Sequence, residues 1–131
     1  MLKPNEEFII PEDMDVECVD LCRTLNEIPG VETFESCSGH LKNRYMVFFE
    51  CNDFYQLARL SRSVNKNYAD GMWEIVVDDA DAHPVFNFWL RSIEPFKSYE
   101  EMTESVNRLI ENIRYWRDSH FDSYFNSNGE C

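Results

Sequence analysis

The stretch VETFESCSGHLKNRYMVFFEC, residues 31 to 51, decides the fold of this chain. Its first part, from Val31 to Ser36, has the β-branched and aromatic character of a strand. Its last part, from Arg44 to Cys51, is apolar on both faces, which is typical of a strand at the centre of a sheet. We therefore predict two strands, with SCSGHLKN as the connection between them.

The residues before this pair of strands predict a helix. Glu7 to Ile10 is a candidate for a short first strand, and the proline and acids that follow it are typical of the first turn of a helix. Apolar residues then recur along one helical face until Pro29-Gly30 ends the helix. Those apolar residues are Met14, Cys18, Leu21, Cys22, Leu25 and Ile28.

The residues after the pair of strands predict a helix, two further strands and a final helix. Asn52 or Asp53 can cap the first of these helices, which ends near residue 65. Alternating patterns over residues 73–78 and 86–91 predict two strands joined by an acidic loop. Ser98 and Glu101 form a capping box, and one apolar stripe continues from it along the last helix.

The predicted order of elements is βαββαββα, or the same order without the first strand. Helices interleaved with pairs of strands indicate an α+β fold, in which helices pack on one face of a mainly antiparallel sheet in a ferredoxin-like or related layout. At 131 residues the chain fits one domain. We place this domain at residues 1–117 and expect residues 118–131 to form a frayed or disordered tail, because helical periodicity is lost there.

The composition indicates a soluble protein of a reducing compartment. Hydrophobic residues make up 44% of the chain, yet no apolar run approaches the roughly 20 residues that cross a bilayer. The first residues lack the features of a signal peptide. Five cysteines, an odd number, are expected to be free thiols rather than a disulfide framework. We therefore expect a cytoplasmic protein with no membrane partner.

The charge is unevenly distributed along the chain. A net charge of −13 disfavours direct nucleic-acid binding, because such binding depends on Lys and Arg beside the phosphates. Residues 1–36 and residues 69–131 each carry −8, whereas residues 37–68 carry +3. The bases of this positive third could form a local anion site, or they could be solvated residues of a hairpin and a helix.

The connection SCSGH, residues 36 to 40, is the main candidate for a functional site. Its glycine permits a left-handed backbone or a close approach to a ligand, and its serines offer hydroxyls beside backbone amides. With two bases close behind, such a loop suits an anionic or nucleotide-like small molecule; the alternative is an ordinary hairpin loop with a solvated histidine. The candidate ligand-binding residues are Thr33, Ser36, Cys37, Ser38, Gly39, His40, Lys42 and Arg44.

The same loop allows two chemical alternatives. Cys37 could act as a nucleophile with His40 as its base, but the sequence indicates neither an orienting group nor an oxyanion site. With Cys18 and Cys22, Cys37 and His40 would make four possible zinc ligands. Cys18 and Cys22, however, share the apolar face of a predicted helix and are more typical of core residues. We therefore assign no metal and no cofactor from the sequence, and whether the protein is an enzyme stays open.

The segment Thr33-Phe34-Glu35-Ser36-Cys37-Ser38-Gly39-His40 resembles the T-x-S-S-C-S-G-R segment of the third-step methyltransferase family of tRNA wybutosine synthesis. It is also similar to an S-C-C-G-H segment of small uncharacterised phage and bacterial proteins. In this chain His40 stands in place of the family's arginine, and Glu35 in place of a serine. The methyltransferase resemblance implies a site for S-adenosylmethionine and substrate at Thr33, Ser36, Cys37, Ser38 and Gly39.

We therefore expect one of three functions, in the following order. The first is a small domain that binds an anionic or nucleotide-like small molecule at the Ser36–His40 loop. The second is an acidic protein that binds a protein partner, as an inhibitor that imitates nucleic acid would. The third is an S-adenosylmethionine-dependent RNA-modifying enzyme.

Overall fold

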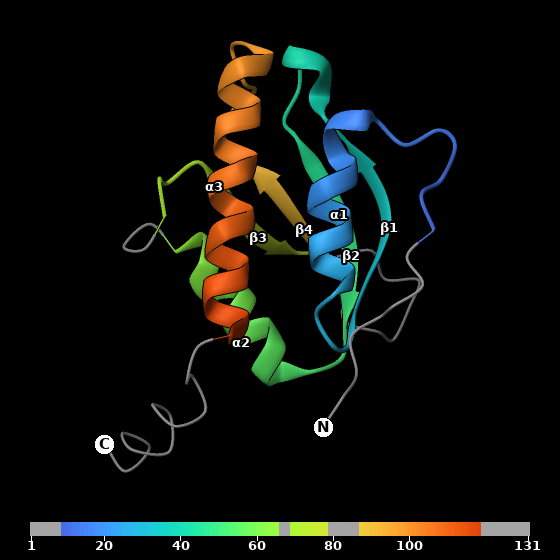
Figure 1. Ribbon diagram of the computed structural model, residues 1–131, viewed down its shortest axis with the longest axis vertical. Coiled ribbons are helices and arrows are strands. Elements are labelled where there is room, and N and C mark those ends of the chain that lie inside the picture. The colour runs from blue at the N-terminus through green and yellow to red at the C-terminus, as the bar shows by residue number, and fades with distance from the viewer. Residues whose placement is uncertain (1–8, 66–68, 79–86, 119–131) are drawn as a thin grey trace.

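The computed structural model describes residues 9–65, 69–78 and 87–118. Within them the chain forms three α-helices and four strands (Figure 1). The helices are α1 (Val19–Asn26), α2 (Phe54–Val64) and α3 (Tyr99–Asp118). The strands are β1 (Val31–Cys37), β2 (Met46–Cys51), β3 (Trp73–Val77) and β4 (Asn87–Ser92). Two short 3-10 turns, η1 (Val16–Cys18) and η2 (Gly39–Leu41), lie before α1 and after β1.

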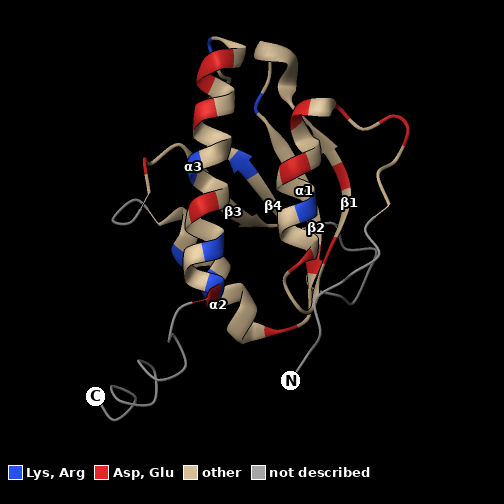
Figure 2. Ribbon diagram, viewed as in Figure 1, with Lys and Arg blue, Asp and Glu red and all other residues tan. Residues whose placement is uncertain are grey.

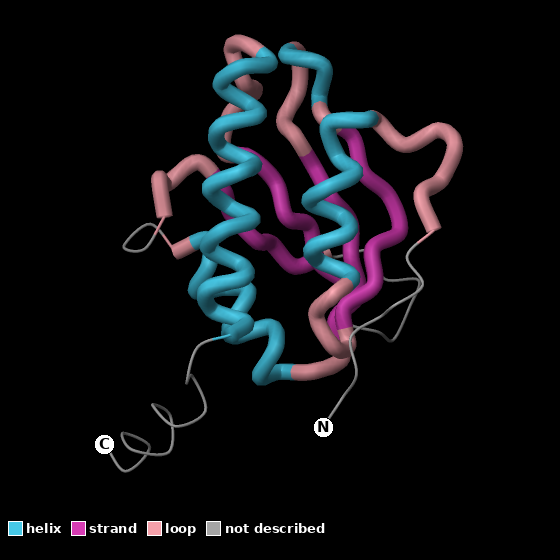
Figure 3. The backbone as a smooth tube through the Cα atoms, in the orientation of Figure 1, coloured by secondary structure: helices cyan, strands magenta, loops and turns pink. Residues whose placement is uncertain are grey.

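The four strands form one open antiparallel sheet in the order β1-β2-β4-β3. The sheet consists of two hairpins, β1–β2 and β3–β4, and each hairpin follows a helix along the chain. Their second strands, β2 and β4, lie side by side at the centre. Figure 3 shows the helices on one side of the sheet, which confirms the predicted α+β class with helices packed on one face.

The core lies between this face of the sheet and the helices. Along β2 the side chains alternate, so that Val47, Phe49 and Cys51 are buried beneath the helices. Met46 and Phe48 point to the opposite face, where they are only half-buried. There the ring of Phe48 contacts two aromatic neighbours, with centroids 5.6 Å from Phe34 and 4.7 Å from Trp89. The apolar character of β2 on both faces therefore reflects a core on one side and an aromatic row on the other.

The chain before α1 differs from the prediction. Ile9 and Ile10 belong to no strand, and the rest of the predicted first strand lies outside the described residues. The helix predicted from residue 11 begins only with η1 and α1. The reason is a long-range contact, because the carboxylate of Asp15 accepts a hydrogen bond from the Ser38 amide at 2.8 Å and holds this segment against the end of β1.

The predicted starts of α2 and α3 are confirmed. The Asp53 carboxylate caps α2, accepting from the amides of Tyr55 at 3.0 Å and Gln56 at 3.2 Å. At the start of α3, the Ser98 hydroxyl accepts from the Glu101 amide at 3.1 Å. This helix continues to Asp118, and residues 119–131 of the predicted tail lie outside the described residues. Among the described helices, none is both long enough and apolar enough to span a membrane.

Candidate functional site

The predicted loop forms a tight turn at the end of the edge strand β1. Three consecutive residues have positive φ angles, namely Gly39 at 81°, His40 at 52° and Leu41 at 67°. For the two residues that carry a side chain, this left-handed backbone costs on the order of 1–3 kcal/mol each. Such a conformation persists only where surrounding contacts hold it.

Glycine is required at position 39 for two reasons. Its φ angle lies in the region that glycine adopts at low cost, and a Cβ atom there would lie 2.8 Å from the Arg44 carbonyl oxygen. The Gly39 carbonyl accepts hydrogen bonds from the amides of Lys42 and Asn43, both at 3.0 Å. The turn is therefore closed by backbone contacts that leave no space for a larger residue.

Asp15 joins this turn from a segment that is remote in sequence. Its Oδ2 atom accepts the hydrogen bond from the Ser38 amide and lies 3.3 Å from Nε2 of His40. The sulfur of Cys37 accepts from the Gly39 amide at 3.4 Å. One carboxylate oxygen of Asp15, the Cys37 sulfur and one ring nitrogen of His40 all lie within 4.8 Å of one another. Within the described part of the chain, no other group of three such side chains lies this close.

The members of this cluster differ in their accessibility. The His40 side chain is 56% exposed, the Asp15 side chain is 22% exposed, and Cys37 is exposed. Ser38 and Gly39 are buried. A ligand that approaches from solvent can therefore reach the thiol, the imidazole and the edge of the carboxylate, but not the Ser38 hydroxyl.

Two of the predicted residues, Thr33 and Ser36, serve the fold. Thr33 exchanges two hydrogen bonds with Asn26 of α1, accepting at its hydroxyl at 2.7 Å and donating its amide at 3.2 Å. The Ser36 side chain is half-buried and lies near the thiols of Cys18 and Cys22. These two residues anchor α1 to β1 and are directed away from the Asp15 cluster.

The two predicted bases do not form one cationic group. Arg44 lies 3.7 Å from Glu74, and the same carboxylate oxygen of Glu74 accepts from Arg91 at 2.6 Å. Arg44 is therefore paired with the carboxylate of Glu74 in β3. Lys42 is exposed beside the turn.

Cys18, the last residue of η1, and Cys22 of α1 do not join Cys37 and His40. Cys18 and Cys22 have no exposed surface, and burial raises the pKa of Cys18 to about 12 and that of Cys22 to about 11. Both thiols are therefore protonated in the folded protein, and neither lies in the group formed by Asp15, Cys37 and His40. The four-ligand set considered from the sequence is not assembled, and Cys18 and Cys22 are core residues.

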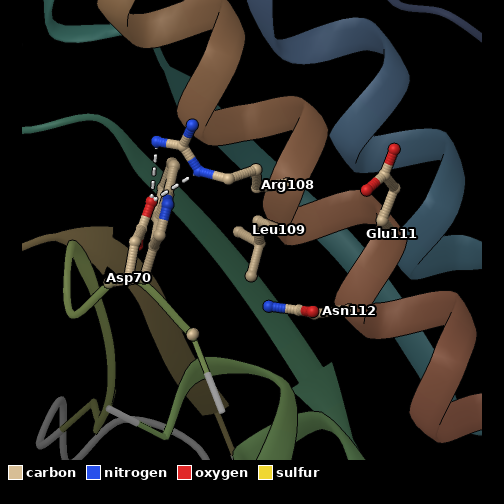
Figure 4. A pocket seen from close by; sticks show the side chains of 7 residues that line it. Asp70, Arg108, Leu109, Glu111 and Asn112 are labelled. Carbon is tan, nitrogen blue, oxygen red and sulfur yellow. Dashed lines mark hydrogen bonds and ion pairs between the residues drawn. The ribbon is translucent and has the colours of Figure 1, made fainter. Parts of the chain in front are cut away.

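A second concave feature, a cavity of about 240 Å³, lies between α3 and the residues that precede β3 (Figure 4). Two polar groups of its lining, the Asp70 carboxylate and the Trp73 indole, already have hydrogen-bond partners. Asp70 Oδ2 accepts from Ser105 at 3.3 Å and from two nitrogens of Arg108 at 3.1 and 3.2 Å, and Oδ1 accepts from the Met72 amide at 3.0 Å. The Trp73 indole donates to Ser105 at 2.9 Å. This network stabilises the packing of α3 and offers no unpaired acceptor on Asp70.

The comparison with known proteins adds no relative. No family model, no curated protein and no solved structure matches this chain. The chemistry of the site therefore has to be argued from its own residues.

The residues predicted from the sequence include Cys37 and His40 but not Asp15. The acids around Asp15 were assigned to the first turn of a helix, where carboxylates are common. Its true contact, the Ser38 amide, is 23 residues away. The only available signal was the acidic residue itself, and it does not specify a distant partner.

The arrangement of the three side chains distinguishes between a catalytic relay and a site for a bound ion. In a Cys-His-Asp relay, the histidine uses one ring nitrogen for the nucleophile and the other for the carboxylate. Here a single ring nitrogen of His40 lies within 4.8 Å of both the Cys37 sulfur and the Asp15 carboxylate. Three donors gathered around one point suit a shared central ion better than a relay.

Proposed function

We propose that the protein is a small binding domain that holds a cation at the β1–β2 connection, through Asp15, Cys37 and His40. The observation that carries this proposal is the convergence of three electron-pair donors from two separate segments within 4.8 Å. An acid, a thiol and an imidazole have in common that each can bind a cation.

The ligand proposed here differs from the anion expected from the sequence. The Ser38 amide, one of the donors that could have bound an anion, already donates to the Asp15 carboxylate. An external anion at this point would lie close to the Asp15 carboxylate and be repelled by it. Arg44, which could have offset this repulsion, already forms an ion pair with Glu74. The Asp15 carboxylate attracts a cation. The geometry therefore supports a binding site at this loop, but for a cation instead of an anion.

The other two expected functions have less support. For methyl transfer, Thr33 and Ser36 would have to face a cofactor, but both are engaged with α1. For an acidic interaction surface, the first turns of α3 carry acids, whereas its later turns carry arginines interspersed with acids (Figure 2). That distribution complements the helix dipole and gives the helix a mixed rather than a uniformly acidic face.

Thermal melting of the full chain with a panel of cations tests the proposal. Zn²⁺, Mn²⁺, Ca²⁺ and Mg²⁺ are added separately to metal-free protein, and at least one should raise the melting temperature. A ligand at about 100 times its Kd stabilises a protein by about 2.7 kcal/mol. The increase should disappear in Asp15→Asn, which keeps an oxygen acceptor for the Ser38 amide.

Asp13→Asn is the matched control, because Asp13 is an exposed neighbour outside the cluster. It should respond to the cation as the unmodified protein does. If no cation shifts the melting temperature, or if Asp15→Asn responds like the control, the proposed function is wrong.

A further inference from the structure

We propose that the bound cation is a divalent transition metal of the zinc class, coordinated by Asp15 oxygen, Cys37 sulfur and His40 nitrogen. This inference rests on the proposed function, because it names the kind of cation that the same site takes. It joins ligands from the segment before η1, from the last residue of β1 and from the turn η2.

The ligand types select the metal. Ca²⁺ and Mg²⁺ bind almost entirely through oxygen, so that a thiol and an imidazole would contribute nothing to their binding. Zn²⁺ and its neighbours in the first transition row bind sulfur, nitrogen and oxygen together. Asp15, Cys37 and His40 supply one of each. The thiol is the discriminating ligand, because it favours a borderline or soft metal over a hard one.

The distances are compatible with a tetrahedral centre. Zinc bonds to these atoms are about 2.0–2.3 Å long, which places neighbouring ligand atoms of a tetrahedron roughly 3.5 Å apart. Asp15 Oδ2 and His40 Nε2 are already 3.3 Å apart. All three ligand atoms lie within 4.8 Å of one another, so shifts of about 1 Å would complete the geometry. Cys37 and His40 are exposed, and their side chains can rotate to make these shifts.

The backbone around the ligands restricts their positions before a metal arrives. The Ser38 amide donates to Asp15 Oδ2, the same oxygen that lies beside His40, and so restricts the position of this ligand atom. The positive φ angle of His40 directs its imidazole toward that carboxylate. Cys37 is the last residue of β1, so the sheet fixes its backbone. All three ligands therefore come from backbone that the fold already restrains.

The charges of the site balance with a divalent metal. Asp15 and the Cys37 thiolate carry two negative charges and His40 binds as the neutral ring, so a metal of charge +2 makes the centre neutral. Binding releases the thiol proton and any proton on the imidazole to solvent.

Cobalt substitution tests the identity of the metal. Metal-free full-length protein is titrated with Co²⁺ and followed by absorption, and Zn²⁺ is then added as competitor. We expect one Co²⁺ per chain, a sulfur-to-cobalt charge-transfer band in the near ultraviolet, and loss of that band when Zn²⁺ is added. In Cys37→Ser the band should be absent and Zn²⁺ affinity, measured by calorimetry, should fall at least about tenfold.

Cys131→Ser is the matched control, because it removes a different thiol of the same chain by the same substitution. It should keep the band and the affinity. Cys37 is exposed, so Cys37→Ser should keep the circular dichroism spectrum and urea midpoint of the unmodified protein.

The outcomes separate the two proposals. Stabilisation by Ca²⁺ or Mg²⁺ that depends on Asp15 but not on Cys37 would keep the cation site and overturn the zinc-class assignment. A charge-transfer band that persists in Cys37→Ser would also overturn the assignment. If no cation binds at all, both proposals fail.

Discussion

Single residues determine the conformation of the candidate site. Gly39 is the clearest example, because its positive φ angle and its close approach to Arg44 both exclude a side chain. The sequence indicated that a glycine here permits such a backbone. It did not indicate that His40 and Leu41 would share the left-handed conformation, because side chains make that conformation unfavourable. The contacts of Leu41 with the core and of Ser38 with Asp15 hold these residues in place.

Alanine substitutions at two glycines measure how strongly the close packing at position 39 excludes a side chain. Gly71 also has a positive φ angle, at 74°, but a Cβ atom there would meet nothing within 4 Å. Gly71→Ala should therefore cost about 1 kcal/mol of unfolding free energy, from backbone strain alone. Gly39→Ala adds a contact of 2.8 Å with a carbonyl oxygen and should cost at least about 2 kcal/mol. Urea unfolding measures both values, and equal costs would contradict the packing argument.

At the scale of elements, local signals located most helices and strands. Residue character predicted β1 and β2, and hydrophobic periodicity predicted β3, β4 and α3, all close to their observed bounds. Capping residues predicted where α2 and α3 begin. These signals succeed because a cap and an amphipathic face are satisfied by residues a few positions apart. The segment before α1 was misassigned because a contact with the sheet edge, not a local signal, determines its path.

The cap of α3 can be tested directly. Ser98→Ala removes the hydroxyl that accepts from the Glu101 amide, and it should reduce the unfolding free energy by about 1 kcal/mol. Thr103→Ala, an exposed change in the body of the same helix, should leave stability within about 0.5 kcal/mol of the unmodified protein. Both are measured by urea unfolding. Equal losses would mean that the hydroxyl does not cap the helix.

At the scale of the whole molecule, the core encloses several groups that can ionise. Cys18, Cys22 and Tyr45 lie together behind the β1–β2 hairpin, and Tyr45 donates its hydroxyl to the Glu17 carbonyl at 2.8 Å. Burial raises the pKa of Tyr45 well above its ordinary 10.0, as it raises those of the two thiols. Each of these groups is therefore neutral in the folded protein.

This burial predicts a loss of stability in alkaline solution. Cys18 has a pKa of about 12 when folded and an ordinary value of 9.0 when unfolded, so above that ordinary value the unfolded chain loses its proton first. The unfolding free energy should be insensitive to this group below pH 9.0 and should then fall by up to about 1.4 kcal/mol per pH unit for each such thiol.

Urea unfolding between about pH 8 and about pH 10.5 measures the slope. Cys18→Ala should be less stable throughout but should show a shallower slope, because one of the titrating groups is gone. An unchanged slope in this variant would show that Cys18 does not contribute to the alkaline loss.

The sequence alone determined most of the elements and the α+β class, because periodicity and caps depend on neighbours within a turn or a strand. It also located Cys37 and His40 beside a glycine turn. Only the tertiary structure decided that β2 pairs with β4, that Thr33 and Ser36 face α1, and that Asp15 joins Cys37 and His40. These contacts join residues that are remote in the chain, and they depend on how the whole core packs. No local pattern of residues specifies them.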